Sequence, residues 1–137
     1  MISLKKLPEE VILYGAGFLA PDFVHFLKKC EKNIKFILDQ KFKSHEEFLG
    51  IPARSLKSSS LNLSAIQDVP VIITVVRENL KNEIQSLLLR KGFKQIYWMF
   101  ELKEYQEYLE SFLIKRKNRK YAGTFKRLLI FRKIFNR

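Results

Sequence analysis

Two glycines that follow an apolar run are the residues of this sequence whose types and spacing best suit a chemical role. Residues 11–20 read Val-Ile-Leu-Tyr-Gly-Ala-Gly-Phe-Leu-Ala and lead into an amphipathic segment. Gly15 can make a tight turn after a strand, Gly17 lets an anion approach backbone N–H groups that a Cβ would shield, and Ala20 allows close helix–strand packing. The start of the next helix adds unsatisfied N–H groups and the positive end of its dipole. The stretch predicts that Gly15, Ala16 and Gly17 bind a phosphate group.

An acidic residue stands at the position that a ribose-binding carboxylate would take. Residues 34–39, Ile-Lys-Phe-Ile-Leu-Asp, predict a second strand that ends at Asp39. Asp39 follows Gly15 by 24 residues, near the offset at which an acid at the end of strand two reaches a ribose hydroxyl. Together the two features predict a nucleotide site. The alternative is that the glycines form only a tight turn and that Asp39 only caps the next loop.

Other side chains that could support catalysis or bind a metal have no suitable partners in the sequence. His25 and His45 stand in a predicted helix and a loop, with no nucleophile and base arranged around them. Cys30 falls on the apolar face of that helix and is interpreted as a small core residue. No Cys/His cluster has metal-ligand spacing. We therefore predict no catalytic or metal-binding residue, and retain Arg77 as a further phosphate contact.

Length and composition favour a single cytoplasmic domain. The chain has 137 residues and one cysteine, so an internal disulfide cannot form. The N-terminal residues have no long apolar core of the signal-peptide kind, and no apolar run is long enough to span a bilayer. We expect a cytoplasmic location.

Apolar runs alternate with amphipathic segments along the chain, which is typical of an α/β fold. The predicted helices are residues 18–31, 78–91 and 101–113, and the predicted strands are residues 11–14, 34–39, 51–54, 69–76 and 93–100. This alternation predicts right-handed crossovers and a Rossmann-like parallel sheet of order 3-2-1-4-5, flanked by helices. In such sheets a ligand lies at the carboxyl ends of the strands, beside the switch between strands one and four. Residues 77–79 should therefore lie opposite the glycine turn.

The positive charge is concentrated at the C-terminal end. The chain carries a net charge of +12, and residues 115–137 hold ten Lys/Arg and no acid. We therefore predict a nucleotide-binding domain over residues 1–100 and a basic helical extension over residues 101–137. Bulky aliphatic residues between the cations favour an anionic membrane surface, at the inner face of the membrane, or a partner enzyme. Nucleic acid is the third alternative, because aromatic residues for base stacking are few there.

The order of these motifs resembles a known domain. The glycine turn at Gly15 and Gly17, then Ile37-Leu38-Asp39, Leu49-Gly50-Ile51-Pro52, the run 71–75 and the segment 91–97 are similar to the small Rossmann-like domain that precedes the β-helix of bacterial sugar acetyltransferases. Related domains accompany other enzymes of surface-polysaccharide assembly. The resemblance covers about residues 10–100 and implies that Gly15, Gly17 and Asp39 contact the nucleotide of a UDP-sugar. The hexapeptide repeats that carry acetyl transfer in that family are absent, and Arg77-Glu78-Asn79 replaces its glycine-containing loop.

Three kinds of function remain open at this stage. The first, which we favour, is a binding module for a nucleotide or nucleotide-sugar, with a UDP-sugar preferred and NAD second, acting in surface-polysaccharide or glycan biosynthesis without its own complete catalytic apparatus. The second is a small NAD-dependent or sugar-modifying enzyme that uses the same glycine-turn pocket. The third is a structural or regulatory protein that keeps the fold, binds no nucleotide and works through its basic tail.

Overall fold

The computed structural model of the chain describes residues 1–115, with side chains as far as Ser111. The predicted basic extension beyond residue 115 lies outside the described residues. The chain divides into two compact units. One is Pro8–Trp98, and the other combines Met1–Leu7 with the segment that begins at Met99.

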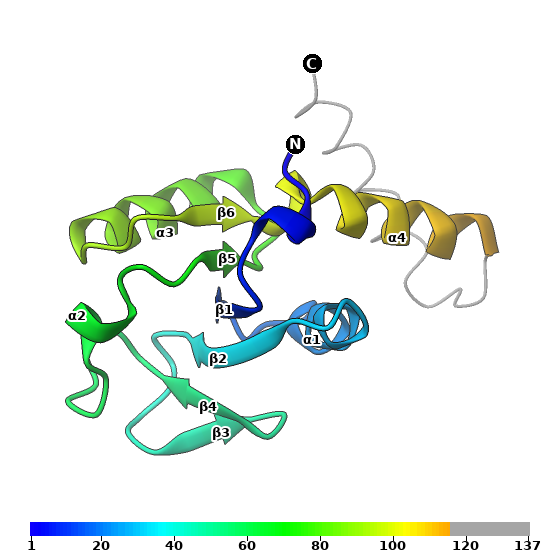
Figure 1. Cartoon of the computed structure of the whole chain (residues 1–137). Helices are drawn as coiled ribbons and strands as arrows, with labels where there is room; N and C mark the ends of the chain where they lie inside the picture. The colour runs from blue at the N-terminus through cyan, green and yellow to red at the C-terminus, as the bar shows by residue number, and fades with distance from the viewer. Residues whose placement is uncertain (116–137) are drawn as a thin grey trace. The chain divides into compact units, whose positions relative to one another are not determined.

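The first unit is built on a six-stranded, mostly parallel sheet (Figure 1). The strands are β1 (Glu10–Tyr14), β2 (Asn33–Leu38), β3 (Glu46–Phe48), β4 (Ile51–Arg54), β5 (Val71–Ile73) and β6 (Ile96–Trp98). They are arranged in the order β3-β4-β2-β1-β5-β6, and only the β3–β4 pair is antiparallel. The α/β class and the mostly parallel sheet are thus as the sequence predicts.

The predicted strand order 3-2-1-4-5 is wrong for this sheet, which has one strand more. The added strand, β3, forms a hairpin with β4 and occupies the edge beyond it. Leu49 and Gly50 connect the two strands, both with positive φ, at 57° and 77°. That backbone is typical of a tight type I′ hairpin turn, which usually contains Asn-Gly. Leucine at the first position gives no such signal, so the hairpin was not predicted.

The central strands are buried on both sides, as parallel strands between helices usually are. Every residue of Val11–Tyr14 in β1 and of Val71–Ile73 in β5 is buried. These apolar runs pair directly, because Ile12, Leu13 and Tyr14 lie opposite Val71, Ile72 and Ile73. The strands therefore hold the glycine turn, which starts where β1 ends, on the most deeply buried part of the sheet.

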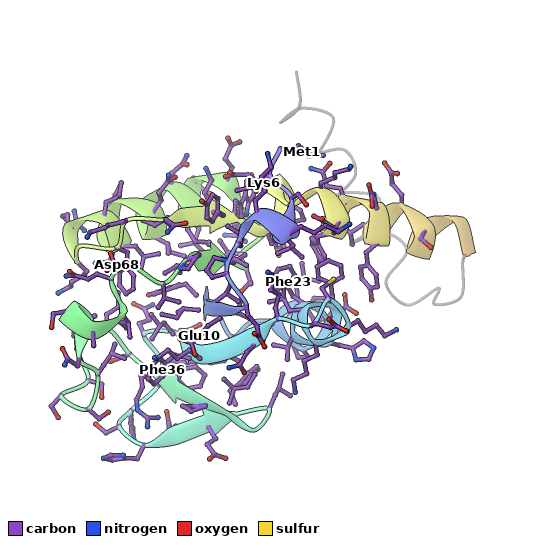
Figure 2. All side chains as sticks on the ribbon, in the orientation of Figure 1. Met1, Lys6, Glu10, Phe23, Phe36 and Asp68 are labelled. Carbon is purple, nitrogen blue, oxygen red and sulfur yellow. The ribbon has the colours of Figure 1, made fainter. Side chains whose placement is uncertain are left out.

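Helices cover the sheet of this unit. They are α1 (Ala20–Lys29), the short α2 (Leu63–Ile66) and α3 (Glu78–Arg90). Figure 1 shows α1 beside β1 and β2, and α3 beside β5 and β6. Phe23 and Leu27 of α1 are fully buried, and Figure 2 labels Phe23 beside this helix. Helix α1 thus buries one apolar face and leaves its N-terminus next to the glycine turn.

The second unit joins the start of the chain to a later segment. It contains the 3-10 turns η1 (Leu4–Lys6) and η2 (Met99–Glu101) and the helix α4 (Lys103–Lys115). Ile2 forms a parallel bridge with Leu102. The Ile2 N–H donates to the Glu101 carbonyl, and the Ile2 carbonyl accepts from the Lys103 N–H, both at 2.9 Å. The Glu104 carboxylate accepts hydrogen bonds from the Ser3 hydroxyl at 2.6 Å and from the Leu4 N–H at 2.9 Å. These contacts fasten the N-terminal residues to the start of α4.

Among the described residues, the structure contains no helix with the length and apolar character that crossing a membrane requires.

Candidate ligand-binding site

The turn after β1 depends on glycine at its first position. Gly15 has φ at +125°, in the region that glycine adopts without strain. A Cβ on Gly15 would stand 2.5 Å from the Thr74 hydroxyl oxygen. That hydroxyl is buried and lies 3.2 Å from the Tyr14 carbonyl oxygen and 3.0 Å from that of Gly15. Thr74 therefore fills the space behind the turn and fixes its backbone against β5.

The Asp39 carboxylate bonds directly to the glycine turn. Its Oδ2 accepts a hydrogen bond from the Ala16 N–H at 2.9 Å, and its Oδ1 accepts one from the Lys41 N–H at 3.1 Å. The Gly15 N–H donates to the Leu38 carbonyl at 2.8 Å, which holds the same turn to the end of β2. Asp39 is half-buried and faces the turn. The structure thus brings together the two features that the sequence predicts as one site.

Lys41 completes a two-sided contact with Ala16. Its ammonium group donates to the Ala16 carbonyl at 2.7 Å, while Asp39 holds the N–H of the same residue. The ammonium nitrogen also lies 5.6 Å from the ring centroids of Phe42 and of Phe48, within the range of cation–π attraction. The loop that follows β2 is therefore fastened to the glycine turn through both polar backbone groups of Ala16.

Gly17 is the open position of the turn. A Cβ placed on Gly17 would meet no atom within 4 Å, and the residue is exposed. Within the described part of the chain, no protein group accepts a hydrogen bond from its N–H. In a trans peptide the Ala16 carbonyl and the Gly17 N–H point to opposite sides, so the ammonium group on that carbonyl leaves this N–H unobstructed.

The start of α1 lies just beyond this open position. Its N-cap residue is Leu19, whose side chain makes no capping hydrogen bond. Such a helix start presents N–H groups and a partial positive charge. Pro21 removes one N–H from the first turn, and Asp22 adds a negative charge there. The Gly17 N–H, together with this helix start, can therefore receive an acceptor oxygen, while the acids at Asp22 and Asp39 limit how much negative charge the corner accommodates.

Tyr14 precedes the turn and belongs to the same corner. Tyr14 is 8 % exposed, and no described residue forms a hydrogen bond with its hydroxyl. Burial and, second, the negative charge of Asp39 raise the pKa of the Tyr14 phenol above its ordinary value. The phenol is therefore a neutral hydrogen-bond donor at physiological pH.

Arg77, which the sequence predicts as a phosphate contact, is exposed and forms the N-cap of α3 in extended backbone. The structure records no contact between its side chain and the glycine turn. Lys81, one turn into the same helix, instead lies over the Trp98 ring, with its nitrogen 5.1 Å from the ring centroid. The predicted role of Arg77 stays a prediction, because a bound ligand would be needed to bring its flexible side chain into place.

The other residues considered at the sequence level lie apart from this corner. His25 is exposed on α1, and His45 is exposed in the loop before β3 with φ at 62°. Cys30 is half-buried after the end of α1. Within residues 1–115 no three His, Cys, Asp or Glu side chains are grouped so that they could hold a metal ion.

Comparison of the chain with protein-family models, with curated proteins and with solved structures finds no match. The geometry of this corner and the resemblance of its motifs are therefore what points to a function.

Three residues of this corner were not predicted from the sequence. Lys41 is an exposed lysine in a polar loop, and Thr74 lies within an apolar run, so neither gives a functional signal before the loops and strands are placed. Tyr14 offered a weak signal, since it is a polar-tipped side chain directly before the first glycine of a nucleotide-type turn. What the assembled corner can do is bind a ligand with hydrogen-bond acceptors at Gly17 and a donor at Asp39.

Proposed function

We propose that the chain is a binding module for a nucleotide or nucleotide-sugar, acting in bacterial surface-polysaccharide or glycan biosynthesis without a complete catalytic apparatus of its own. The single observation that carries this proposal is that Gly17 lies open, with an N–H that no described residue binds. A Cβ on Gly17 would enter open space, its N–H has no acceptor among the described residues, and the helix that follows has no capping bond from its N-cap residue Leu19. A phosphate oxygen is the acceptor that such a position suits best.

The position of Asp39 supports a nucleotide over a simple phosphate. An ionised carboxylate offers about four acceptor positions, and the Asp39 carboxylate uses two of them for the N–H groups of Ala16 and Lys41. The remaining capacity allows it to accept a hydrogen bond from a ribose hydroxyl. Because Asp39 already holds Ala16, the carboxylate would need no rearrangement to receive the sugar.

The same hydrogen bonds favour one way of placing the ligand. A phosphate at the Ala16 N–H would have to displace the carboxylate and would meet its negative charge. At Gly17 the phosphate avoids that conflict, and the ammonium group of Lys41, which donates to the Ala16 carbonyl, adds a positive charge beside the turn. The phosphate is therefore placed at Gly17 and the ribose at Asp39.

The identity of the nucleotide and the biological process rest on the resemblance. The small Rossmann-like domain of bacterial sugar acetyltransferases implies a UDP-sugar and a role in glycan assembly. NAD is the second candidate, since a carboxylate at the end of β2 would bind the ribose of either ligand.

Isothermal titration calorimetry with UDP, UDP-N-acetylglucosamine, NAD and coenzyme A tests the proposal. Binding of UDP or the UDP-sugar, with NAD and coenzyme A silent, is the expected result. Binding of NAD alone would favour the enzyme alternative and would contradict the nucleotide-sugar assignment. If none of the four ligands binds, the corner is a structural turn and the proposed function is wrong.

A further inference from the structure

Tyr14 differs from Asp39 and Thr74 at the glycine turn, because no described residue forms a hydrogen bond with its hydroxyl. The residue is 8 % exposed, and its hydroxyl forms no hydrogen bond with another described residue. Its oxygen is not among the fully enclosed polar atoms that lack a partner, so the hydroxyl reaches the surface from a residue that is otherwise buried. A donor that is positioned by a buried ring and reaches the surface is available to a ligand.

The register of the sheet places Tyr14 at the ligand edge. Tyr14 pairs with Leu38 of β2 and with Ile73 of β5, so it lies in the last row of the central strands before the carboxyl-end loops. Leu38 directly precedes Asp39, and Tyr14 directly precedes Gly15. The phenol and the carboxylate therefore come from adjacent strands, and each is next to a residue that forms the proposed nucleotide corner.

Arg54 occupies the same row on the next strand, but its side chain is committed to the protein. It pairs with Leu38 in register, and its guanidinium donates to the Ser60 hydroxyl and to the carbonyls of Glu46 and Ala53. Of the polar side chains in this row, Tyr14 therefore keeps its donor for a ligand.

The Tyr14 phenol can donate a hydrogen bond, and the Asp39 carboxylate can accept one. Tyr14 supplies a hydrogen-bond donor, because a phenol is neutral at physiological pH and because burial and the charge of Asp39 raise its pKa further. Asp39 supplies acceptor oxygens that its two backbone contacts leave unused. A hydroxyl group placed between the two can accept from one and donate to the other at the same time. Ribose carries such hydroxyl groups, whereas phosphate offers only acceptors.

We propose that Tyr14 is a ligand-binding residue, whose hydroxyl donates to a ribose hydroxyl that in turn donates to the Asp39 carboxylate, so that the site selects ribonucleotides over 2′-deoxyribonucleotides. This inference rests on the proposed function and names the part of the nucleotide that the corner recognises. It also adds Tyr14 to the binding residues proposed in the glycine turn and at Asp39.

The test compares UDP with 2′-deoxy-UDP on the full chain, the variant Tyr14→Phe and the control Tyr97→Phe. Tyr97 is half-buried on β6, where its hydroxyl lies 3.4 Å from the Gln95 side-chain oxygen, so the control removes a hydroxyl from the same sheet outside the proposed corner. Affinities come from titration calorimetry, and thermal unfolding of each variant reports whether the fold is kept. We expect Tyr14→Phe to unfold at an unchanged temperature, because the described residues form no hydrogen bond with this hydroxyl.

The expected result is about a tenfold weaker binding of UDP to Tyr14→Phe, the size of effect of one ligand hydrogen bond. The unmodified chain and Tyr97→Phe should both prefer UDP to 2′-deoxy-UDP, and Tyr14→Phe should lose most of that preference. Equal UDP affinity in the unmodified chain and Tyr14→Phe would overturn the inference and leave the proposed function intact. Absence of UDP binding to the unmodified chain would overturn both.

Discussion

The Asp39 carboxylate accepts a hydrogen bond from the Ala16 N–H, with 2.9 Å between Oδ2 and the nitrogen. This bond joins the end of β2 to the turn that follows β1. The same residue that would bind a ribose therefore also shapes the turn that would bind a phosphate. Loss of the Asp39 charge should consequently affect stability as well as ligand binding.

Asp39→Asn should lower the free energy of unfolding by about 1–2 kcal/mol, because the amide has one acceptor oxygen in place of two: one charge-assisted bond to a backbone N–H becomes a weaker neutral bond and the other is lost. Urea unfolding followed by circular dichroism measures the change. Asp68→Asn is the matched control, since Asp68 forms an exposed ion pair with Lys94 at 2.9 Å, and such pairs contribute little. If the two variants were equally stable, the bond between Asp39 and Ala16 would have no role in holding the turn.

Gly15→Ala should be strongly destabilising, by roughly 2 kcal/mol or more, since the new Cβ adds backbone strain and a steric overlap. The overlap is with the Thr74 hydroxyl, and the strain comes from φ at +125°. Gly17→Ala is the contrasting variant, and its unfolding free energy should stay the same or rise by about 0.4–1 kcal/mol because its Cβ enters open space.

A double variant separates the two causes of the lower stability expected for Gly15→Ala, which are the steric overlap and the backbone strain. Thr74→Ala removes the steric overlap but not the backbone strain. Gly15→Ala should therefore destabilise a chain that already carries Thr74→Ala less than it destabilises the unmodified chain. An equal loss of stability in both chains would mean that the positive φ alone makes glycine necessary, and a Gly15→Ala chain as stable as the original would contradict the geometry of the turn.

The contact of Glu104 with the N-terminal residues predicts a dependence on acid. Desolvation acts to raise the pKa of Glu104, but hydrogen bonds from Ser3, Leu4 N–H and its own backbone N–H, with the charge of Lys103, lower that pKa overall. A carboxyl whose pKa is lower in the folded state stabilises the fold above its unfolded pKa of about 4.3, and this stabilisation is lost as the pH falls through the folded value.

Unfolding free energies measured between pH 6 and pH 2.5 check this prediction. The unmodified chain should lose more stability over that range than Glu104→Gln, which has no carboxyl to titrate. Ser3→Ala should bring the pKa of Glu104 closer to its ordinary value, because the hydroxyl contact at 2.6 Å is removed. Parallel pH profiles for all three proteins would show that the contact does not contribute to stability.

The parts of the fold that were predicted correctly depend on local sequence, and the parts that were missed depend on contacts between distant residues. The run before Gly15 and the acid at Asp39 give strand ends directly, because apolar runs and their polar termini are visible in the sequence. Strand β3 was missed, since its residues Glu46-Glu47-Phe48 are mostly polar and its turn begins with Leu49 at positive φ.

The candidate site shows the same division. Its glycines follow from the spacing, but the bond between Asp39 and Ala16 requires the register of β1 against β2. The hydrogen bond from Lys41 to the Ala16 carbonyl depends, in addition, on the path of the loop after β2. The role of Arg77 and the basic segment beyond residue 115 stay predictions, as do the nucleotide and the process in which it acts.

The measurement that tests the central claim most directly is calorimetric titration of UDP into the unmodified chain, Gly17→Ala and Gly17→Val. Because a side chain at this position enters open space, all three proteins should fold, and thermal unfolding confirms it. We predict a graded loss, with Gly17→Val at least about tenfold weaker than the unmodified chain, since its side chain shields the N–H that a phosphate would approach. Equal UDP affinity for the folded unmodified and Gly17→Val chains would contradict the claim that a nucleotide phosphate binds at this turn.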